Sequence, residues 1–265
     1  MAEIEVDGVR VSYRARPGGA VPLVFLHGGF GSSSALWARA MDALPPYCSA
    51  YAIDNFLASD PPPGGYNVGA FARRTAGFAR ALGLERPILV GHSMGGVVCQ
   101  LAGIEHPAAV GGLVLVCTGP SMTDHRLGRE LLDRLRREGG DERNMRAISA
   151  NWFYRVPEDG FFDRYVADAA RAPLEAMIEV QESLIATDLR PLLGRIAVPT
   201  LVVHGGYDTG RTIEHARALL DGIRGSELAV MRHSGHSPMV ETPQEFDAAL
   251  HDFLARRAAA QPAAM

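Results

Sequence analysis

The stretch PILVGHSMGGVV occupies residues 87–98 of the chain and has Ser93 near its centre. Apolar residues 88–90 predict a short buried strand, and the small and apolar residues from Gly96 onward predict a helix. Between them, residues 91–95 match G-x-S-x-G, the pattern of a sharp turn called a nucleophile elbow. Such a turn strains the backbone at the Ser and leaves no room for side chains at Gly91 and Gly95. The stretch therefore predicts that the Ser93 hydroxyl projects above a sheet, near the positive end of a helix.

The pattern alone is a modest signal, because Gly and Ser are common in loops. The alternative interpretation is an ordinary Gly-rich turn between a strand and a helix. The flanking strand and helix favour the elbow, and the interpretation requires a base and a carboxylate elsewhere in the chain.

Strand and helix patterns alternate on both sides of this stretch. Asp7-Gly8 predicts a hairpin between residues 3–6 and 9–13. We expect further strands at 22–27, 49–54, 110–117, 198–204 and 227–231, and helices at 35–44, 68–82, 213–220 and 243–257. This alternation predicts an α/β fold, with a mostly parallel central sheet flanked by helices on both faces.

Residues 121–194 break the alternation. They contain no buried-strand run, and apolar residues recur at helical spacing, as at Leu127, Leu131 and Leu135. We expect a helical cap, or lid, inserted into a core domain formed by residues 1–120 and 195–265. The Ala-rich residues 258–265 are expected to form a disordered tail.

Composition limits the possible partners. The chain has 265 residues, of which 47% are hydrophobic and 21% charged, as expected for a soluble globular protein. A net charge of −4 and an isoelectric point of about 6.1 argue against binding to nucleic acid or to an anionic membrane. We expect a small-molecule substrate, no nucleic-acid or membrane partner, and a monomer or a homodimer.

Cysteine usage and the N-terminal sequence indicate the compartment. Cys48, Cys99 and Cys117 are far apart and show neither a disulfide framework nor metal-ligand spacing. The first residues are acidic and do not resemble a signal peptide, and no stretch reaches the ~18 apolar residues of a membrane helix. The sequence predicts a cytoplasmic protein without a metal site.

Two residues downstream of Ser93 complete a candidate catalytic set. Serine is a poor nucleophile unless a base takes its proton, and the base needs an orienting carboxylate. Asp208 follows the strand predicted at 198–204, and His236 follows the strand predicted at 227–231. Because parallel strands end at the same edge of a sheet, Ser93, Asp208 and His236 are expected to converge there.

Competing assignments exist for both partners. Asp208 is also placed to cap the following helix, and His233 is the nearest rival of His236. We favour His236, because Gly235 suits an exposed loop histidine, whereas His233 belongs to the strand end. His92 is interpreted as a packing residue.

The turn after the strand at 22–27 predicts an oxyanion hole. Backbone N–H groups must face the negative charge that develops on the substrate oxygen. The residue after the nucleophile, Met94, supplies one donor, and Gly29 supplies the other, with Phe30 as its possible replacement. His27 is expected to pin this loop. A phosphate-binding loop is the alternative, but the Lys-Ser/Thr pair of that motif is missing.

The motifs together resemble the α/β-hydrolase family, specifically its capped esterase, lactonase and C–C-bond hydrolase branch. The resemblance rests on His27-Gly-Gly, on residues 91–96, on Gly206-Tyr-Asp208, and on Gly235-His236 followed by Glu241-Thr-Pro. It implies that Ser93 is the nucleophile, His236 the base and Asp208 its orienting acid, in agreement with the reading from the residues.

Two departures from the family pattern concern the substrate. Relatives carry a loop similar to D-x-x-G-x-G-x-S where this chain reads DNFLASDPPPG from Asp54. C–C-bond hydrolases often place Trp directly after the catalytic His, and here that residue is Ser237.

The cap region supplies the candidate substrate contacts. Trp152, Phe153 and Tyr154 form an aromatic run which, together with Phe30, is expected to line an apolar substrate pocket. The alternative is that these aromatics form the cap's own core. Arg126 and Arg155 are candidate anchors for a substrate carboxylate.

We therefore expect a serine hydrolase that cleaves a small ester, lactone or thioester without a cofactor. The alternatives are hydrolysis of a C–C bond in a vinylogous diketone by the same three residues, a peroxidase-like side activity, or a ligand-binding, receptor-like role.

Overall fold

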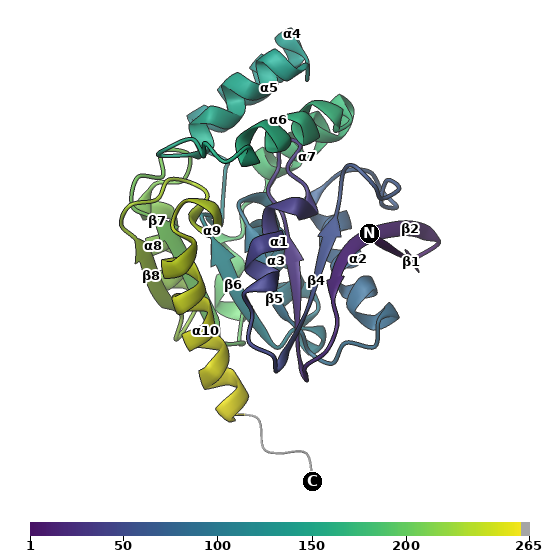
Figure 1. The fold of residues 1–265 in the computed structure, drawn as a ribbon, viewed down its shortest axis with the longest axis vertical. Helices are drawn as coiled ribbons and strands as arrows, with labels where there is room; N and C mark the ends of the chain where they lie inside the picture. Colours follow the sequence, from purple (N-terminus) through teal and green to yellow (C-terminus); the bar gives the residue numbers. More distant parts are fainter. Residues whose placement is uncertain (261–265) are drawn as a thin grey trace.

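An eight-stranded sheet crosses the centre of the computed structural model, which describes residues 1–260 (Figure 1). The strands lie in the order β1-β2-β4-β3-β5-β6-β7-β8. β1 and β2 pair antiparallel, as do β2 and β4, and all other neighbours are parallel. The strand bounds are β1 Ala2–Val6, β2 Val9–Arg16, β3 Val21–Leu26, β4 Cys48–Asp54, β5 Ile88–His92, β6 Gly112–Val116, β7 Thr200–Gly205 and β8 Glu227–Met231.

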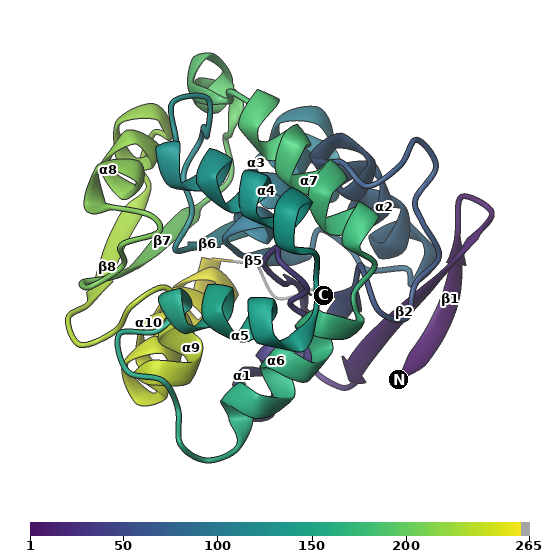
Figure 2. The ribbon, with the colours of Figure 1, turned by 90° about the horizontal axis from the view of Figure 1, so that it is seen from above.

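Helices cover both faces of this sheet, as the view from above shows (Figure 2). One face carries α2 (Val68–Ala81), α3 (Met94–Glu105) and α8 (Ile213–Gly222). The other carries α1 (Ala38–Asp42), α9 (Pro238–Glu241) and α10 (Pro243–Ala260). The expected α/β architecture, a mostly parallel sheet between two helical layers, is confirmed.

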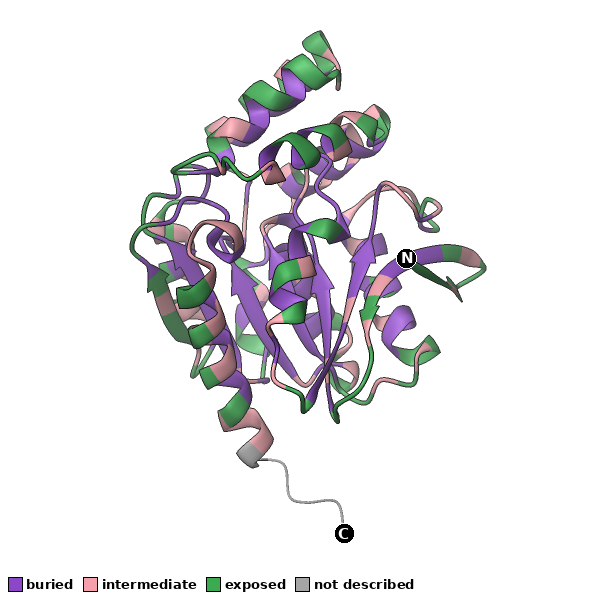
Figure 3. Cartoon of the chain, viewed as in Figure 1, coloured by how far each residue is buried: buried purple, intermediate pink, exposed green. Residues whose placement is uncertain are grey.

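The core lies where this double covering is complete (Figure 3). Every residue of β5, β6 and β7 is buried, whereas β8 at the edge of the sheet exposes most of its residues. Strands covered on both faces carry continuous apolar runs rather than an alternating pattern. This explains why the runs around residues 88, 113 and 201 could be recognised in the sequence.

The chain between β6 and β7 is helical and lies above the carboxyl ends of the strands (Figures 1 and 2). α4 packs beside α7, and α5 beside α6. The bounds are α4 Arg126–Glu138, α5 Glu142–Ser149, α6 Phe161–Arg171 and α7 Leu174–Ala186, with short 3₁₀ turns η3 Ala150–Trp152 and η4 Arg190–Arg195. Another turn, η2, spans Pro107–Ala109.

Two expected elements differ in the structure. The helix expected at 35–44 is a 3₁₀ turn, η1 (Ser34–Trp37), followed by the short α1. The tail expected to begin at Ala258 is helical as far as Ala260, and its remaining residues lie outside the described part of the chain. Within residues 1–260, no helix combines the length and the apolar character needed to cross a membrane.

Gly95, two residues after Ser93, packs closely against the backbone at the end of β3. A Cβ atom on Gly95 would lie 2.4 Å from the Leu26 carbonyl oxygen, which a rigid sheet cannot move aside. A Cβ on Gly103, in the same helix, would meet only side chains at ordinary contact distances, Leu113 at 3.4 Å and Ile196 at 3.9 Å. We expect Gly95→Ala to lower the free energy of unfolding by about 1–3 kcal/mol, as overpacking does.

Gly103→Ala is the matched control, and Ala in place of helical Gly should leave stability unchanged or raise it by about 0.5–1 kcal/mol. Urea denaturation of both variants checks the pair. Equal stability of the two would contradict the close packing under Ser93.

Candidate active site

Ser93 lies in the turn between β5 and α3 and adopts a strained backbone conformation. Its φ is +52° and its ψ is −111°, a region that residues with a side chain rarely occupy. A Cβ on Gly91 would lie 2.3 Å from the Gly95 carbonyl oxygen, and a Cβ on Gly95 would lie 2.4 Å from the Leu26 carbonyl oxygen. Neither glycine can therefore be replaced unless the backbone moves. Two hydrogen bonds fix the turn: the Ser93 N–H donates to Val116 O at 2.9 Å, and the Thr118 hydroxyl donates to Ser93 O at 2.7 Å.

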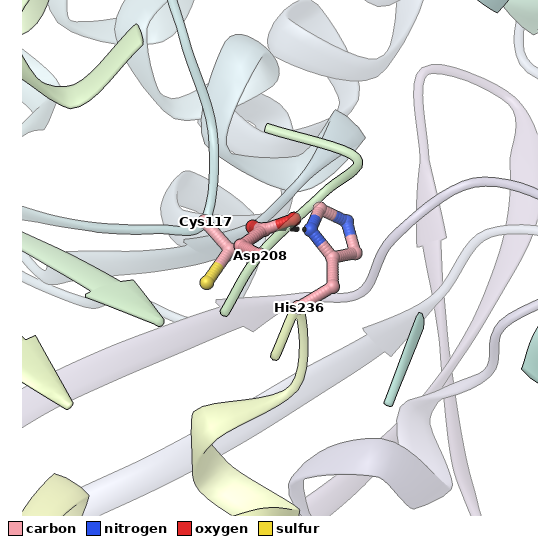
Figure 4. Close-up of side chains that lie close together, drawn as sticks. All are labelled: Cys117, Asp208 and His236. Atoms are coloured by element: carbon pink, nitrogen blue, oxygen red, sulfur yellow. Dashed lines mark hydrogen bonds and ion pairs between the residues drawn. The ribbon is translucent and has the colours of Figure 1, made fainter. Parts of the chain in front are cut away.

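Asp208 and His236 form a buried hydrogen-bonded pair (Figure 4). The loop after β7 carries Asp208, and the loop between β8 and α9 carries His236. His236 Nδ1 lies 2.7 Å from Asp208 Oδ2, while Oδ1 accepts the N–H groups of Gly210 and Arg211 at 2.9 and 2.8 Å. Although burial opposes ionisation, the His236 ring and these hydrogen bonds hold the pKa of Asp208 below its ordinary value.

This pairing determines how the imidazole is oriented. A carboxylate only accepts hydrogen bonds, so Nδ1 of His236 carries a proton and Nε2 is the nitrogen that can accept one. Ser93 and His236 line the same cavity. Among the described residues, no hydrogen bond joins the Ser93 hydroxyl to the His236 ring, and such contacts often tighten only with substrate. The exposure expected for His236 is wrong: it is buried among its contacts, whereas His233, the alternative base, is exposed to solvent.

His92 contacts both the backbone and the ring of His236. Its Nε2 lies 2.7 Å from the His236 carbonyl oxygen, and the two ring centroids are 4.7 Å apart. Since a carbonyl only accepts, His92 Nε2 is the donor. Burial lowers the pKa of His92 to about 3, so the ring is neutral at physiological pH. The structure gives this histidine a positioning contact rather than the position of a base.

Three backbone N–H groups near Ser93 are available to a ligand. Gly29, Phe30 and Met94 line the cavity with Ser93, and within residues 1–260 none of their N–H groups has an acceptor. His27 holds the loop that carries two of them. Its Nε2 accepts the Asn55 N–H at 2.9 Å, which leaves a proton on Nδ1 to donate to Gly28 O at 2.8 Å.

Glu241, at the end of α9, connects the His236 loop to the helical segment. Its carboxylate accepts the N–H groups of Gly235 at 2.9 Å and Ser237 at 3.3 Å, on either side of His236. It also accepts those of Tyr154 at 2.7 Å and Arg155 at 3.2 Å. Burial raises the pKa of Glu241, and the four donors act in the opposite direction. The sequence motif contains Glu241, but only the fold shows that it joins two segments more than eighty residues apart.

The cavity around Ser93 is largely apolar. Trp152 packs against Phe30 at 5.6 Å between centroids and against His236 at 5.4 Å. Leucines and methionines supply much of the remaining wall: Met94, Met122, Leu127, Leu131 and Leu184. Three polar residues also line the wall: Gln181 of α7, His125 just before α4, and Arg211 in the loop after β7. The sequence did not single them out for this site, because long-range packing rather than a local pattern brings them to the cavity.

Two of the aromatic residues expected at the substrate lie elsewhere. Phe153 packs edge-on against Phe162 and Tyr165 in an aromatic cluster of the helical segment. Tyr154 is exposed and stacks on Tyr207 at 3.9 Å. Neither is among the residues that line the cavity, whereas Phe30 and Trp152 are.

One group of possible metal ligands coincides with the buried pair. Ligand atoms of Cys117, Asp208 and His236 lie within 4.8 Å of one another (Figure 4). Burial raises the pKa of the Cys117 thiol well above its ordinary value, and only the thiolate binds metals well. Asp208 Oδ2 and His236 Nδ1 are also hydrogen-bonded to each other. The arrangement therefore favours proton transfer over metal binding.

Comparisons with known proteins agree with this geometry. The profile described as "Alpha/beta hydrolase family" matches residues 23–249. The 2-hydroxy-6-oxo-6-phenylhexa-2,4-dienoate hydrolase of Comamonas testosteroni is 30% identical over 208 residues, covering 70% of this chain and 68% of that protein.

Two solved structures share the fold. An esterase from Exiguobacterium antarcticum superimposes with a TM-score of 0.88 at 22% identity, over 96% of this chain and 98% of that one. The enol-lactonase from Burkholderia xenovorans LB400 gives 0.85 at 23% identity, over 96% and 100%.

The bridge made by Glu241 can be tested by amide hydrogen exchange. Glu241→Gln removes the charge that four backbone N–H groups share, and hydrogen bonds to charged groups are worth more than neutral ones. We expect exchange at Gly235 and Ser237 and at Tyr154 and Arg155 to accelerate together, by about tenfold to a hundredfold.

Glu245→Gln, an exposed carboxylate one turn further on, is the matched control and should leave both segments unchanged. Acceleration in one segment only, or equal exchange in the two variants, would show that Glu241 does not couple them.

Proposed function

We propose that this chain, a hydrolase that belongs to the alpha/beta hydrolase family, cleaves a small ester, lactone or thioester through an acyl-enzyme on Ser93. The observation that carries the proposal is the position of Ser93, on a strained turn, in the same cavity as a histidine that is hydrogen-bonded to a buried carboxylate. This combination is the requirement for an activated serine nucleophile.

The first half of the reaction forms the acyl-enzyme. His236 Nε2 takes the hydroxyl proton as Ser93 Oγ attacks the substrate carbonyl carbon. The carbonyl π electrons move to its oxygen, and the N–H groups of Met94 and of Gly29, with Phe30 as its alternative, stabilise the resulting oxyanion. The C–O or C–S bond then breaks, and the imidazolium returns its proton to the leaving group.

The second half repeats these steps with water. His236 takes a proton from water, the hydroxide attacks the acyl carbon, and Ser93 leaves with that proton. Asp208 stays ionised throughout, in keeping with its lowered pKa, and stabilises the imidazolium formed twice in each cycle. No step of this scheme requires a cofactor.

Residues 121–194 act in this proposal as a cap over the core domain of residues 1–120 and 195–265. Trp152 and the leucines of α4 and α7 close the cavity on the side away from the sheet. An apolar wall keeps bulk solvent away from the reacting groups and so strengthens the electrostatic contacts within the site. The shape of the cap then selects the acyl group.

Hydrolysis of a C–C bond is the second candidate. It is supported by the 30% identity to the dienoate hydrolase and would use the same three residues. Ser237, which follows His236 where such enzymes often have Trp, favours the ester or lactone reaction.

Single substitutions test the assignment against 4-nitrophenyl esters of increasing acyl length and against simple lactones. We expect Ser93→Ala and His236→Ala to lower kcat/KM at least about a thousandfold, because each removes a group that forms or breaks a bond. His233→Ala is the matched control, since His233 is exposed and three residues away, and it should keep wild-type rates.

Ester turnover that survives in Ser93→Ala, or that is lost equally in His233→Ala, would contradict the proposal. Inactivity of the wild type toward every ester and lactone, with Ser93 still labelled by a fluorophosphonate, would favour C–C substrates.

A further inference from the structure

Arg211 places a buried positive charge beside the proposed catalytic residues. It follows Asp208 by three positions in the loop after β7, is only 3% exposed, and lines the cavity that contains Ser93 and His236. Among the described residues, it is the only Lys or Arg lining that cavity. Buried arginines are normally paired with a carboxylate, because removing an isolated charge from water is costly.

The guanidinium of Arg211 has no such partner within residues 1–260. Its only hydrogen bond is a long one, from Nη1 to Ser121 O at 3.4 Å. Asp208 is the nearby carboxylate, but its oxygens accept hydrogen bonds from His236 and from the backbone N–H groups of Gly210 and Arg211. A guanidinium has five N–H donors in a planar fork, so most of them are left for a ligand.

Asp208 attracts the Arg211 charge without pairing with it, and the two nearby histidines add no negative charge. His125, at the start of α4, accepts the Gly128 N–H at Nδ1 and donates from Nε2 to Gly210 O at 2.7 Å. Burial lowers the pKa of His125, and the positive charge of Arg211 lowers it further. The same two causes, burial being the larger, lower the pKa of His215, on α8, to about 4. Burial lowers the pKa of Arg211 itself to about 10, so the guanidinium is still charged at neutral pH.

We propose that Arg211 binds a carboxylate of the substrate, so that the natural substrate is a small ester or lactone that bears one carboxylate away from the scissile bond. This inference rests on the proposed hydrolase function. A planar guanidinium matches a carboxylate with two parallel hydrogen bonds. Among the described residues, Arg211 is the only Lys or Arg lining this largely apolar cavity, and a single guanidinium favours a monoanion over a phosphate dianion.

The arginines expected from the sequence to hold a carboxylate are less suited to it. The Arg126 side chain is 89% exposed and pairs with Glu130. Arg155 lies over the exposed Tyr154 ring, 5.5 Å from its centroid. Neither lines the cavity of Ser93.

A pair of matched substrates measures the effect of the carboxylate. The mono-4-nitrophenyl ester of adipic acid carries a free carboxylate, and its methyl ester is the neutral counterpart with the same chain and leaving group. Rates are corrected with Ser93→Ala for spontaneous hydrolysis. We expect the wild type to favour the charged ester in kcat/KM by about tenfold to a hundredfold, the range of a hydrogen bond to a charged group.

Arg211→Gln should reduce this ratio to about one or below, and Arg211→Lys, which keeps the charge but not the fork, should give an intermediate ratio. Arg126→Gln is the control variant and should keep the wild-type ratio. Thermal unfolding with hexanoate, which carries one carboxylate on an apolar chain, provides a readout that is independent of turnover: hexanoate should raise the Tm of the wild type and of Arg126→Gln but not that of Arg211→Gln.

The outcomes separate the two proposals. A wild type that hydrolyses both esters at equal kcat/KM, or an Arg211→Gln variant that keeps the preference, would overturn the carboxylate site while leaving the hydrolase function intact. A wild type that hydrolyses neither ester but is stabilised by hexanoate through Arg211 would support the anion site and contradict ester hydrolysis.

Discussion

The close approach of backbone to backbone beneath Ser93 is the constraint on which the rest of the site depends. The turn between β5 and α3 forms only because Gly91 and Gly95 leave room for neighbouring carbonyl oxygens. In return, Ser93 is held at a φ of +52°, with its N–H and its carbonyl both tied to the strand end beside it. The buried sheet therefore determines the position of the Ser93 hydroxyl, and no flexible loop is involved in placing it.

The histidine, in contrast, is on a loop and is positioned by contacts from several directions. His92, in the strand before the elbow, donates to the His236 carbonyl oxygen, and the His236 backbone N–H donates to Trp152 O at 3.1 Å. Glu241 fixes the residues on either side and the first residues after Trp152. The same set of contacts therefore orients the base and attaches the helical segment above it, so movement of that segment would be transmitted to His236.

Most of the fold and the centre of the candidate site were predictable from the sequence. Ser93, Asp208 and His236 each follow a strand that could be recognised as an apolar or β-rich run, and parallel strands bring such positions to one edge. The walls of the cavity were less predictable. The sequence groups Phe153 and Tyr154 with Trp152 because the three are adjacent, yet their rings lie in three different environments. The burial of Arg211 at the cavity and the bridging role of Glu241 were not predictable, because both result from long-range packing, which leaves no local pattern.

Covalent trapping tests the central claim, that Ser93 carries the acyl group, most directly. The wild type is mixed with 4-nitrophenyl acetate, quenched with acid during the first turnover, digested and analysed by mass spectrometry. We expect an acetyl group on Ser93, appearing with the initial release of 4-nitrophenol and disappearing as the substrate is consumed. Release of 4-nitrophenol with no acetylated Ser93 at any quench time, or with the acetyl group on another residue, would contradict the account.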